Sequence, residues 1–258
     1  MSEATTANEV ATNLQEPDVL FVLPAYNEEE QIGWAMKELA SWLDKNAHYT
    51  WRVMAADNAS TDATLAIAQA LADERPEAFA AYHLDEKGRG RALRRVWLAS
   101  GSRVVAYMDV DLSTALGAIA PLVDPLLSND GDISFGSRLA KGAHCKRGLR
   151  REFVSRCYNF LLRSAFGWNV GYAARDAQCG FKAVRGEVAQ ELLPRVADNG
   201  WFFDTELLVR GYARGLRLIE VPVTWTEDLG TTVKVVSTAM DDLRGMWRLL
   251  KEIRRGTI

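Results

Sequence analysis

The chain has 258 residues, of which 48% are hydrophobic and 25% charged, a composition that suits one α/β domain with a sizeable core. The formal net charge of −3 excludes a protein that binds polyanions over its whole surface, so a basic function requires a local patch. The three cysteines form no CxxC pair, which argues against a disulfide framework or a zinc site and indicates reduced intracellular thiols.

Residues 1–16 are polar and slightly acidic, and they show no periodicity, so we predict a disordered arm. They also lack the basic and then apolar pattern of a signal peptide, and no run approaches the roughly 18 apolar residues that cross a bilayer. We expect the protein in the cytoplasm or at the inner face of the cell membrane, without a span.

Short apolar runs alternate with amphipathic stretches, which predicts a parallel sheet covered by helices. The expected strands are residues 19–23, 51–56, 80–84, 103–108 and 132–135. Helices are expected from about 28 to 45, from a cap at Ser60 or Thr61 towards 72, and after Gly88 and Gly90. Ligands of open α/β sheets bind where strands end, so we expect the polar residues at these ends to share one rim. They are Asp57, Asp109, Asp111, Ser137 and Arg138.

The second half is predicted to contain a basic helix at 152–166, strands at 181–184 and 218–224, and helices at 204–213 and 233–254. We expect one domain over 17–230 and an appended amphipathic helix over 231–258. That helix has an apolar stripe beside a basic band, and we expect the stripe to pack on the domain, with an anionic membrane interface as the alternative. The stripe is Val236, Met240, Leu243, Trp247 and Leu250, and the band is Arg244, Arg248, Lys251 and Arg255.

The sharpest local signal is a pair of carboxylates, Asp109 and Asp111, just past an apolar strand. Two such carboxylates can meet on one Mg²⁺ or Mn²⁺, which prefers oxygen ligands together with a substrate diphosphate. The metal would neutralise charge on a departing diphosphate. The alternative interpretation is a helix N-cap followed by a solvated acid.

Two further motifs follow the first two strands, at residues 24–28 and 57–62. Together with the two aspartates they resemble the family 2 glycosyltransferases, in the order and position of all three motifs. The resemblance implies a GT-A fold, a Rossmann-like nucleotide-binding domain with a mixed, mostly parallel sheet flanked by helices. It also implies a nucleotide-sugar site made of Pro24, Ala25, Tyr26, Asn27, Glu28, Asp57, Asn58, Lys87, Gly88, Asp109, Val110 and Asp111.

Residues 87–91 form a basic turn loosened by glycines at a predicted helix start. Such a turn offers backbone N–H groups and cations to an anion, although a plain loop has the same composition. The family often carries Lys-Gly at this place, which favours the anion site.

Later motifs at 135–138, 175–182, 201–206 and 220–225 resemble the dolichyl- or polyprenyl-phosphate glucosyl- and mannosyltransferases, above all the dolichyl-phosphate glucosyltransferase type. The resemblance covers about residues 17–250 and implies inverting, metal-dependent transfer of a hexose from UDP-glucose or GDP-mannose to a polyprenyl phosphate, as in the assembly of cell envelope glycans. The QxxRW motif of processive polysaccharide synthases does not occur. Many members of this branch carry membrane-spanning helices after the catalytic domain, and the sequence here ends at Ile258.

A phosphate acceptor is already anionic near neutral pH, with a second pKa of roughly 6, so it needs cations more than a general base. Residues 138–163 supply eight Lys or Arg residues against one acid, Glu152. Guanidinium groups bind phosphate oxygens in a fork, and a solvated basic helix face is the alternative. The predicted ligands of the acceptor phosphate are Ser137, Arg138, Arg150 and Arg151.

Four more residues belong to the predicted site. Asp176 acts as a base or orients the sugar, and Gln178 contacts the sugar or the metal shell. Asp204 and Glu206 help to close the site, or are acids at a helix N-terminus. Cys179 is expected to be a packed thiol. Two other functions stay open: transfer to a water-soluble hydroxyl acceptor with Asp176 as base, and a non-catalytic nucleotide-sugar-binding protein.

Overall fold

The structure is a computed structural model that describes residues 15–146, 160–162, 164–167, 175–226 and 235–255. The predictions for the N-terminal arm, and those for Arg150 and Arg151, lie outside the described residues. In the described part of the chain, no helix combines the length and the apolar character needed to cross a membrane.

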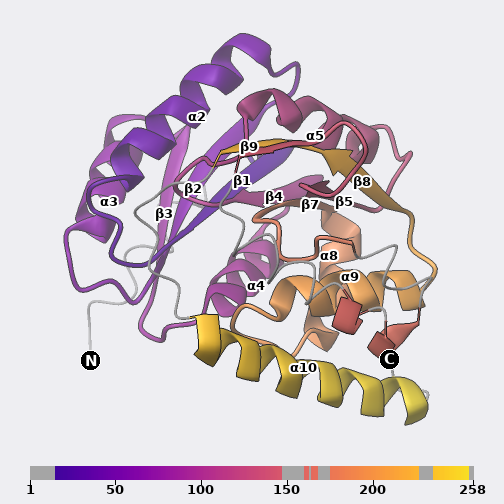
Figure 1. Cartoon of the computed structure of the whole chain (residues 1–258). Helices are drawn as coiled ribbons and strands as arrows, with labels where there is room; N and C mark the ends of the chain where they lie inside the picture. Colours follow the sequence, from indigo (N-terminus) through magenta and orange to yellow (C-terminus); the bar gives the residue numbers. More distant parts are fainter. Residues whose placement is uncertain (1–14, 147–159, 163, 168–174, 227–234, 256–258) are drawn as a thin grey trace.

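A seven-stranded sheet forms the centre of the domain, in the order β3-β2-β1-β4-β7-β5-β8 (Figure 1). Strand β7 pairs antiparallel with β4 and β5, and the other neighbours are parallel, so the predicted mixed, mostly parallel sheet is confirmed. A short second sheet pairs β6 with β9. The strands are β1 Val19–Ala25, β2 Trp51–Asn58, β3 Phe79–Leu84, β4 Val104–Met108, β5 Ile133–Ser137, β6 His144–Lys146, β7 Phe181–Arg185, β8 Leu218–Pro222 and β9 Thr224–Thr226.

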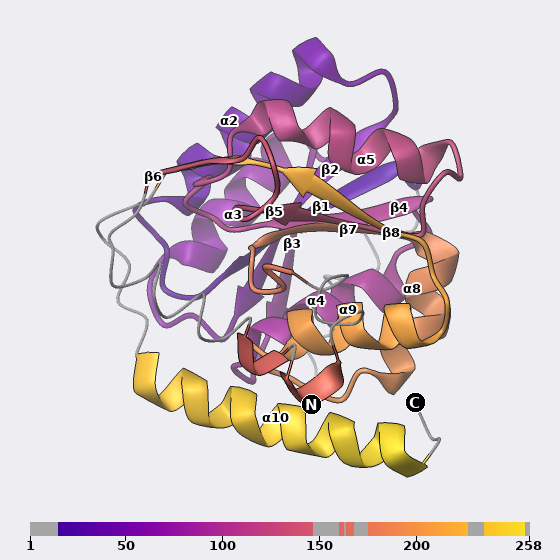
Figure 2. The ribbon, with the colours of Figure 1, turned by 45° about the vertical axis from the view of Figure 1, so that its right-hand side comes forward.

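Helices cover both faces of the sheet and enclose two apolar cores (Figures 1 and 2). On one face lie α2 Ile32–Asn46, α3 Thr64–Glu74 and α5 Ile119–Leu127, and on the other α4 Arg89–Ala99, α8 Gly186–Leu192 and α9 Phe203–Ala213, with α10 Val235–Arg255 outside them. Short 3-10 turns, Leu116–Ala118 and Leu193–Arg195, precede α5 and follow α8. The central strands β1, β4 and β5 are buried on both sides, so both faces of the middle of the sheet are apolar.

The carboxyl ends of β1, β2, β4 and β5 lie at one edge of the sheet, because these four strands run in the same direction. Asp57 is the last residue but one of β2, Asp109 directly follows β4, and Arg138 directly follows β5. The predicted common rim is therefore confirmed as a feature of the topology.

The predicted cap of α3 is wrong. The helix begins at Thr64, whose backbone N–H donates to Asp62 Oδ1 at 3.0 Å. Ser60 and Thr61 instead bond to the loop after β1: Ser60 Oγ accepts from Asn27 N at 2.9 Å, and Thr61 N donates to Asn27 Oδ1 at 2.8 Å. The polar residues before this helix serve to join two loops.

The predicted packing of the C-terminal helix is also wrong. Met240, Leu243 and Trp247 of the expected packing stripe are 53%, 51% and 67% exposed. The helix packs on the domain through a different face, which carries Met246 and Leu249. These side chains are 4% and 0% exposed. Both faces are apolar, and periodicity alone does not say which of them meets the domain.

Candidate active site

The loop that carries the two aspartates is held against the loop before β7. Asp109 N donates to the carbonyl oxygen of Gly180 at 3.1 Å, and Leu112, with φ +47°, turns the chain back. A Cβ added to Gly180 would lie 1.7 Å from Asp109 Oδ2, so only glycine fits there. Asp111 Oδ1 accepts from Ser113 N at 2.9 Å. Backbone groups thus fix the main chain of Asp109 and the carboxylate of Asp111.

Arg89, in the first turn of α4, links two carboxylates at the floor of the site. Its Nη1 donates to Asp204 Oδ2 at 2.6 Å and its Nη2 to Asp109 Oδ1 at 3.1 Å. The guanidinium lies 4.8 Å from the ring centroids of Tyr107 and Trp201. The close approach of α4 and α9 depends on Gly90, where a Cβ would lie 2.6 Å from Phe203 Cβ.

Asp204 lies at the centre of this network and is fully compensated. Tyr107 Oη donates to its Oδ1 at 2.5 Å, and Lys182 Nζ lies 3.2 Å from the same oxygen. Burial opposes the charge, but Lys182 and Arg89 hold the pKa of the Asp204 carboxyl below its ordinary value. Arg89 thus connects Asp204 to Asp109, and the place of Asp204 in the site stays a prediction.

Asp109 has the opposite balance. Loss of solvation raises the pKa of its carboxyl, and the charges of Asp111 and Asp204 add to the rise against the effect of Arg89. A carboxylate crowded by two others gains from a cation, which fits the chemistry of a divalent ion. Among the described residues, no group of three or more His, Cys, Asp or Glu side chains is placed to hold a metal. An ion at Asp109 and Asp111 would therefore need further oxygens from water or from a diphosphate.

The predicted nucleoside loops are tied to each other. Asn27 adopts φ +54° and bonds to Ser60 and Thr61, and Glu28 N donates to Thr64 Oγ1 at 2.8 Å. Pro24 and Ala25 end β1, and Val110 is buried in the core. Tyr26, another residue of the predicted nucleotide-sugar site, is 36% exposed. Lys87 Nζ lies 3.2 Å from the centroid of its ring, in a cation–π contact.

Asp57 is buried at the end of β2 with one oxygen bound and one without a partner. His83 Nδ1 lies 2.6 Å from Oδ2, whereas Oδ1 has no hydrogen-bond partner in the described structure. Beside it, Asn58 Oδ1 accepts from Gly88 N at 2.6 Å, which holds the basic turn against β2. An unsatisfied buried acceptor costs about 1–3 kcal/mol, and an N–H donor of a bound base would remove that cost.

On the other side of the rim, Arg138 and Asp176 bind each other. Asp176 Oδ2 accepts from Arg138 N at 2.7 Å and Nε at 2.9 Å, and Oδ1 accepts from Nη2 at 2.6 Å. The Arg138 guanidinium lies 5.4 Å from the ring centroid of Trp225, and Asp176 adopts φ +57°. Ser137 is buried, and its Oγ accepts from Leu139 N at 3.2 Å. The Arg138 guanidinium, predicted to bind the acceptor phosphate, therefore binds the carboxylate of Asp176 in this structure.

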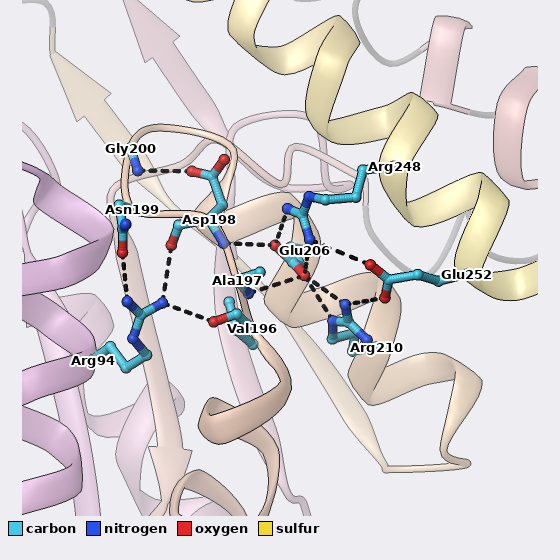
Figure 3. A network of polar contacts seen from close by, with 10 residues as sticks. All are labelled: Arg94, Val196, Ala197, Asp198, Asn199, Gly200, Glu206, Arg210, Arg248 and Glu252. Carbon is cyan, nitrogen blue, oxygen red and sulfur yellow. Dashed lines mark hydrogen bonds and ion pairs between the residues drawn. The ribbon is translucent and has the colours of Figure 1, made fainter. Parts of the chain in front are cut away.

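Gln178 and Glu206 both contact the C-terminal helix α10. Gln178 Nε2 donates to Asp242 Oδ2 at 2.7 Å. Glu206 is fully buried and binds Arg210 and Arg248, and it also accepts from the backbone N–H groups of residues 197 and 198 (Figure 3). Its geometry joins α9 to α10 and leaves no oxygen directed to the rim.

Cys179 is buried, and burial raises the pKa of its thiol to about 12. It is therefore a neutral thiol at physiological pH, as expected for a packed residue.

The part of the chain that carries these loops, residues 20–190, matches the model for glycosyl transferase family 2. The chain belongs to this family. It is 34% identical over 258 aligned residues to the glycosyltransferase AglD of Haloferax volcanii, covering 96% of this chain and 40% of AglD. It is 29% identical over 225 residues to the dolichyl-phosphate beta-glucosyltransferase ALG5C of Trichomonas vaginalis, covering 83% of this chain and 66% of that protein. The chain thus spans less than two thirds of the length of either relative.

Solved structures of two enzymes share the fold. Glucosyl-3-phosphoglycerate synthase of Mycobacterium tuberculosis, solved with uridine diphosphate, matches with a TM-score of 0.67 at 21% identity, over 97% of this chain and 86% of that chain. Mannosyl-3-phosphoglycerate synthase of Rubrobacter xylanophilus matches with a TM-score of 0.65 at 15% identity, over 97% and 77%. The predicted GT-A fold of this glycosyltransferase is therefore confirmed.

The sequence analysis did not predict the roles of Arg89 and Lys182, which bind the carboxylates of the candidate site. Arg89 lies between two residues of the predicted anion turn, Gly88 and Gly90, but its role is to neutralise carboxylates. Lys182 interrupts an otherwise apolar strand and is fully buried. A lysine in a buried strand signals a partner carboxylate, because an unpaired buried charge is too costly.

Proposed function

We propose that this glycosyltransferase transfers a hexose, with inversion, from a nucleotide sugar to the phosphate of a polyprenyl phosphate. One acceptor oxygen would form a bond to the anomeric carbon as that carbon's bond to the nucleoside diphosphate breaks, and the bonding electrons leave with the diphosphate. The observation that carries the choice of acceptor is the pairing of Asp176 with Arg138. The named function of the relatives, transfer of glucose to dolichyl phosphate, supports the same choice.

The donor side supports a nucleotide sugar. Asp57 would accept an N–H of the base through its unpaired Oδ1, and Tyr26 with Lys87 would lie beside the nucleoside. We favour UDP-glucose over GDP-mannose because the named relatives include dolichyl-phosphate beta-glucosyltransferases. Asp109 and Asp111 would hold Mg²⁺ or Mn²⁺, which offsets charge on the leaving diphosphate.

The acceptor side supports an anionic nucleophile. Both oxygens of Asp176 already accept hydrogen bonds from Arg138, so Asp176 is poorly placed to take a proton from a hydroxyl acceptor. A phosphate oxygen needs no such base. Arg138 would orient Asp176 towards the reacting sugar, or meet the phosphate after exchange of partners. Arg150 and Arg151 stay predicted phosphate ligands.

The test is a panel of donors and acceptors with Mg²⁺ or Mn²⁺, with products identified by mass spectrometry. UDP-glucose, GDP-mannose and their relatives are each incubated with polyprenyl phosphate in detergent, and with water-soluble hydroxyl acceptors. We expect a glycosylated lipid phosphate, formed from one donor and absent in chelator. A product on a soluble hydroxyl alone would establish the other enzyme class, and donor binding without any product would establish a non-catalytic binding protein.

A further inference from the structure

Helix α10 has two apolar faces, and the domain uses only one of them. The inner face packs through Met246 and Leu249, and Gly245 lets the ring of Phe202 approach so closely that a Cβ would lie 2.3 Å from Phe202 Cδ1. The side chains of Arg248 and Glu252 also turn inward, to Glu206 and Arg210 (Figure 3). These contacts fix the rotation of the helix and leave the opposite face outside.

The opposite face, here called the outward face, combines exposed apolar and cationic side chains. It consists of Met240, Leu243, Arg244, Trp247, Lys251, Arg254 and Arg255. Leu243, Trp247 and Lys251 line one shallow groove on it, with Lys251 Nζ 5.1 Å from the Trp247 ring centroid. Exposed apolar groups of this size, gathered on one face, indicate a contact surface.

The charge of this segment differs from that of the whole protein. Residues 244–255 contain five cationic side chains and one carboxylate, whereas the chain as a whole carries a net charge of −3. The carboxylate, Glu252, is bound to Arg210 on the inner side. Asp241 pairs with Arg244 at 2.9 Å, and Lys251, Arg254 and Arg255 extend the positive surface beyond that pair.

We propose that the outward face of α10 docks the protein on an anionic lipid surface. A helix of this kind lies in the plane of the interface, with tryptophan, leucine and methionine below the headgroups and the long cations reaching anionic phosphates. Each cation near such a surface contributes about fivefold to binding. This inference goes beyond the proposed reaction, because it requires neither donor nor acceptor.

The charge pattern argues against the two other occupants of such a face. In a twofold dimer the same surface meets itself, so this positively charged face would pack against a second positively charged face. A nucleic acid would attract the cations, but the apolar side chains of Met240 and Leu243 donate no hydrogen bonds to phosphate or base edges. An anionic bilayer satisfies both the apolar and the charged side chains.

The docking helix also reaches the candidate active site. Asp242, on the inner side of its first half, accepts from Gln178 at 2.7 Å, and Gln178 lies two residues from both Asp176 and Gly180. Docking through α10 would therefore hold the rim close to the headgroups, where a lipid-borne phosphate lies.

The test is co-sedimentation of the full chain with vesicles of phosphatidylcholine, with and without phosphatidylglycerol. The variant Trp247→Glu is compared with Trp34→Glu, because Trp34 is also an exposed tryptophan, 53% exposed, on a distant helix. Lys251→Glu is compared with Lys37→Glu on that same helix. Melting curves of the four variants confirm that each is folded.

We expect binding to the phosphatidylglycerol vesicles that weakens at high salt. Trp247→Glu should weaken it by about tenfold or more and Lys251→Glu by about fivefold, with both α2 variants unchanged. The proposal is overturned if the wild type does not sediment with these vesicles, or if Trp247→Glu and Trp34→Glu bind to them equally well. It is also overturned if the wild type self-associates and Trp247→Glu does not, because the outward face would then be a dimer interface. Transfer to polyprenyl phosphate in detergent is measured in parallel, so a failed reaction with intact vesicle binding would reject the acceptor and keep the docking surface.

Discussion

The two sides of the rim differ in how their carboxylates are satisfied. On the donor side, Asp57 keeps one oxygen without a partner among the described residues, and the pKa of Asp109 is raised. On the side proposed for the acceptor, Asp176 is bound by Arg138. Away from the rim, Glu206 is bound by Arg210 and Arg248. Asp57 thus lacks one hydrogen-bond donor, and Asp109 is only partly compensated by Arg89, whereas Asp176 is paired within the protein.

This difference indicates where a ligand contributes most. A nucleoside diphosphate with a divalent ion brings an N–H donor and positive charge, the two things that Asp57 and Asp109 lack. Asp176 is already paired with Arg138 without a ligand. We therefore expect substitutions on the donor side to affect ligand binding and catalysis, and those at Glu206 and Arg248 to affect stability.

Replacement of Asp109 or Asp111 by Asn is expected to have the largest effect. Loss of one charged metal ligand removes several kcal/mol of charge stabilisation, so transfer should fall by about a thousandfold or more. Initial rates with Mn²⁺ and with chelator measure this for each variant. A variant that retains full activity in chelator would remove the metal from the account.

Gly180→Ala should be the next most damaging change. Its Cβ would displace the carboxylate of Asp109, and a shift of about 1 Å costs about a hundredfold in rate. Gly117→Ala is the matched control, because a Cβ there meets nothing within 4 Å. Steady-state kinetics compare the two variants, and equal rates for both would show that the position of Asp109 does not matter.

Asp242 of α10, which binds Gln178, differs from Asp176 because one of its oxygens has no partner among the described residues. Its Oδ1 is buried without a partner, and burial raises the pKa of its carboxyl to about 7 from 3.8. Between these values the unfolded chain ionises while the folded protein keeps the proton, so the wild type loses stability as the pH rises. Asp242→Asn cannot ionise and should gain about 2–4 kcal/mol relative to the wild type between about pH 4 and about pH 8.

Urea unfolding of the wild type and of Asp242→Asn at both pH values measures this gain. A stability difference that does not change with pH would mean that Asp242 ionises normally in the folded protein.

Arg248→Met should have the smallest of these effects, and it should act on stability alone. It leaves the buried Glu206 with one cation fewer, at a cost of about 2 kcal/mol in the free energy of unfolding. Arg244→Met, in an exposed pair with Asp241, should change stability by less than about 0.5 kcal/mol. Urea unfolding compares the pair, and equal stability losses would remove the structural role of Glu206.

The sequence predicted those parts of the fold that follow from runs of one kind of residue. Strands β1, β2 and β4 are largely apolar runs, and polar motifs stand at or directly after their ends, so both the strands and their polar ends were readable. Helix α5 has no counterpart among the predicted elements, because Pro121 and Pro125 interrupt its pattern and only the tertiary packing of its apolar face restores it.

The candidate site was predictable in its motifs but not in its pairings. Asp176 and Arg138 are separated by 38 positions, and Arg89 and Asp204 by 115, so no local pattern reveals that they bind each other. The rotation of α10 was unreadable for a related reason. It depends on Gly245, whose missing side chain admits the ring of Phe202, and a hydrophobic pattern gives such a glycine no weight.

The most direct test of the contrast between the two sides is calorimetric titration of uridine diphosphate with Mn²⁺ into Asp57→Asn and Asp176→Asn. The account predicts that Asp57→Asn weakens binding by about tenfold or more, because the bound base loses its carboxylate acceptor, while Asp176→Asn stays within about twofold of the wild type. Unchanged affinity in Asp57→Asn together with lost affinity in Asp176→Asn would contradict it.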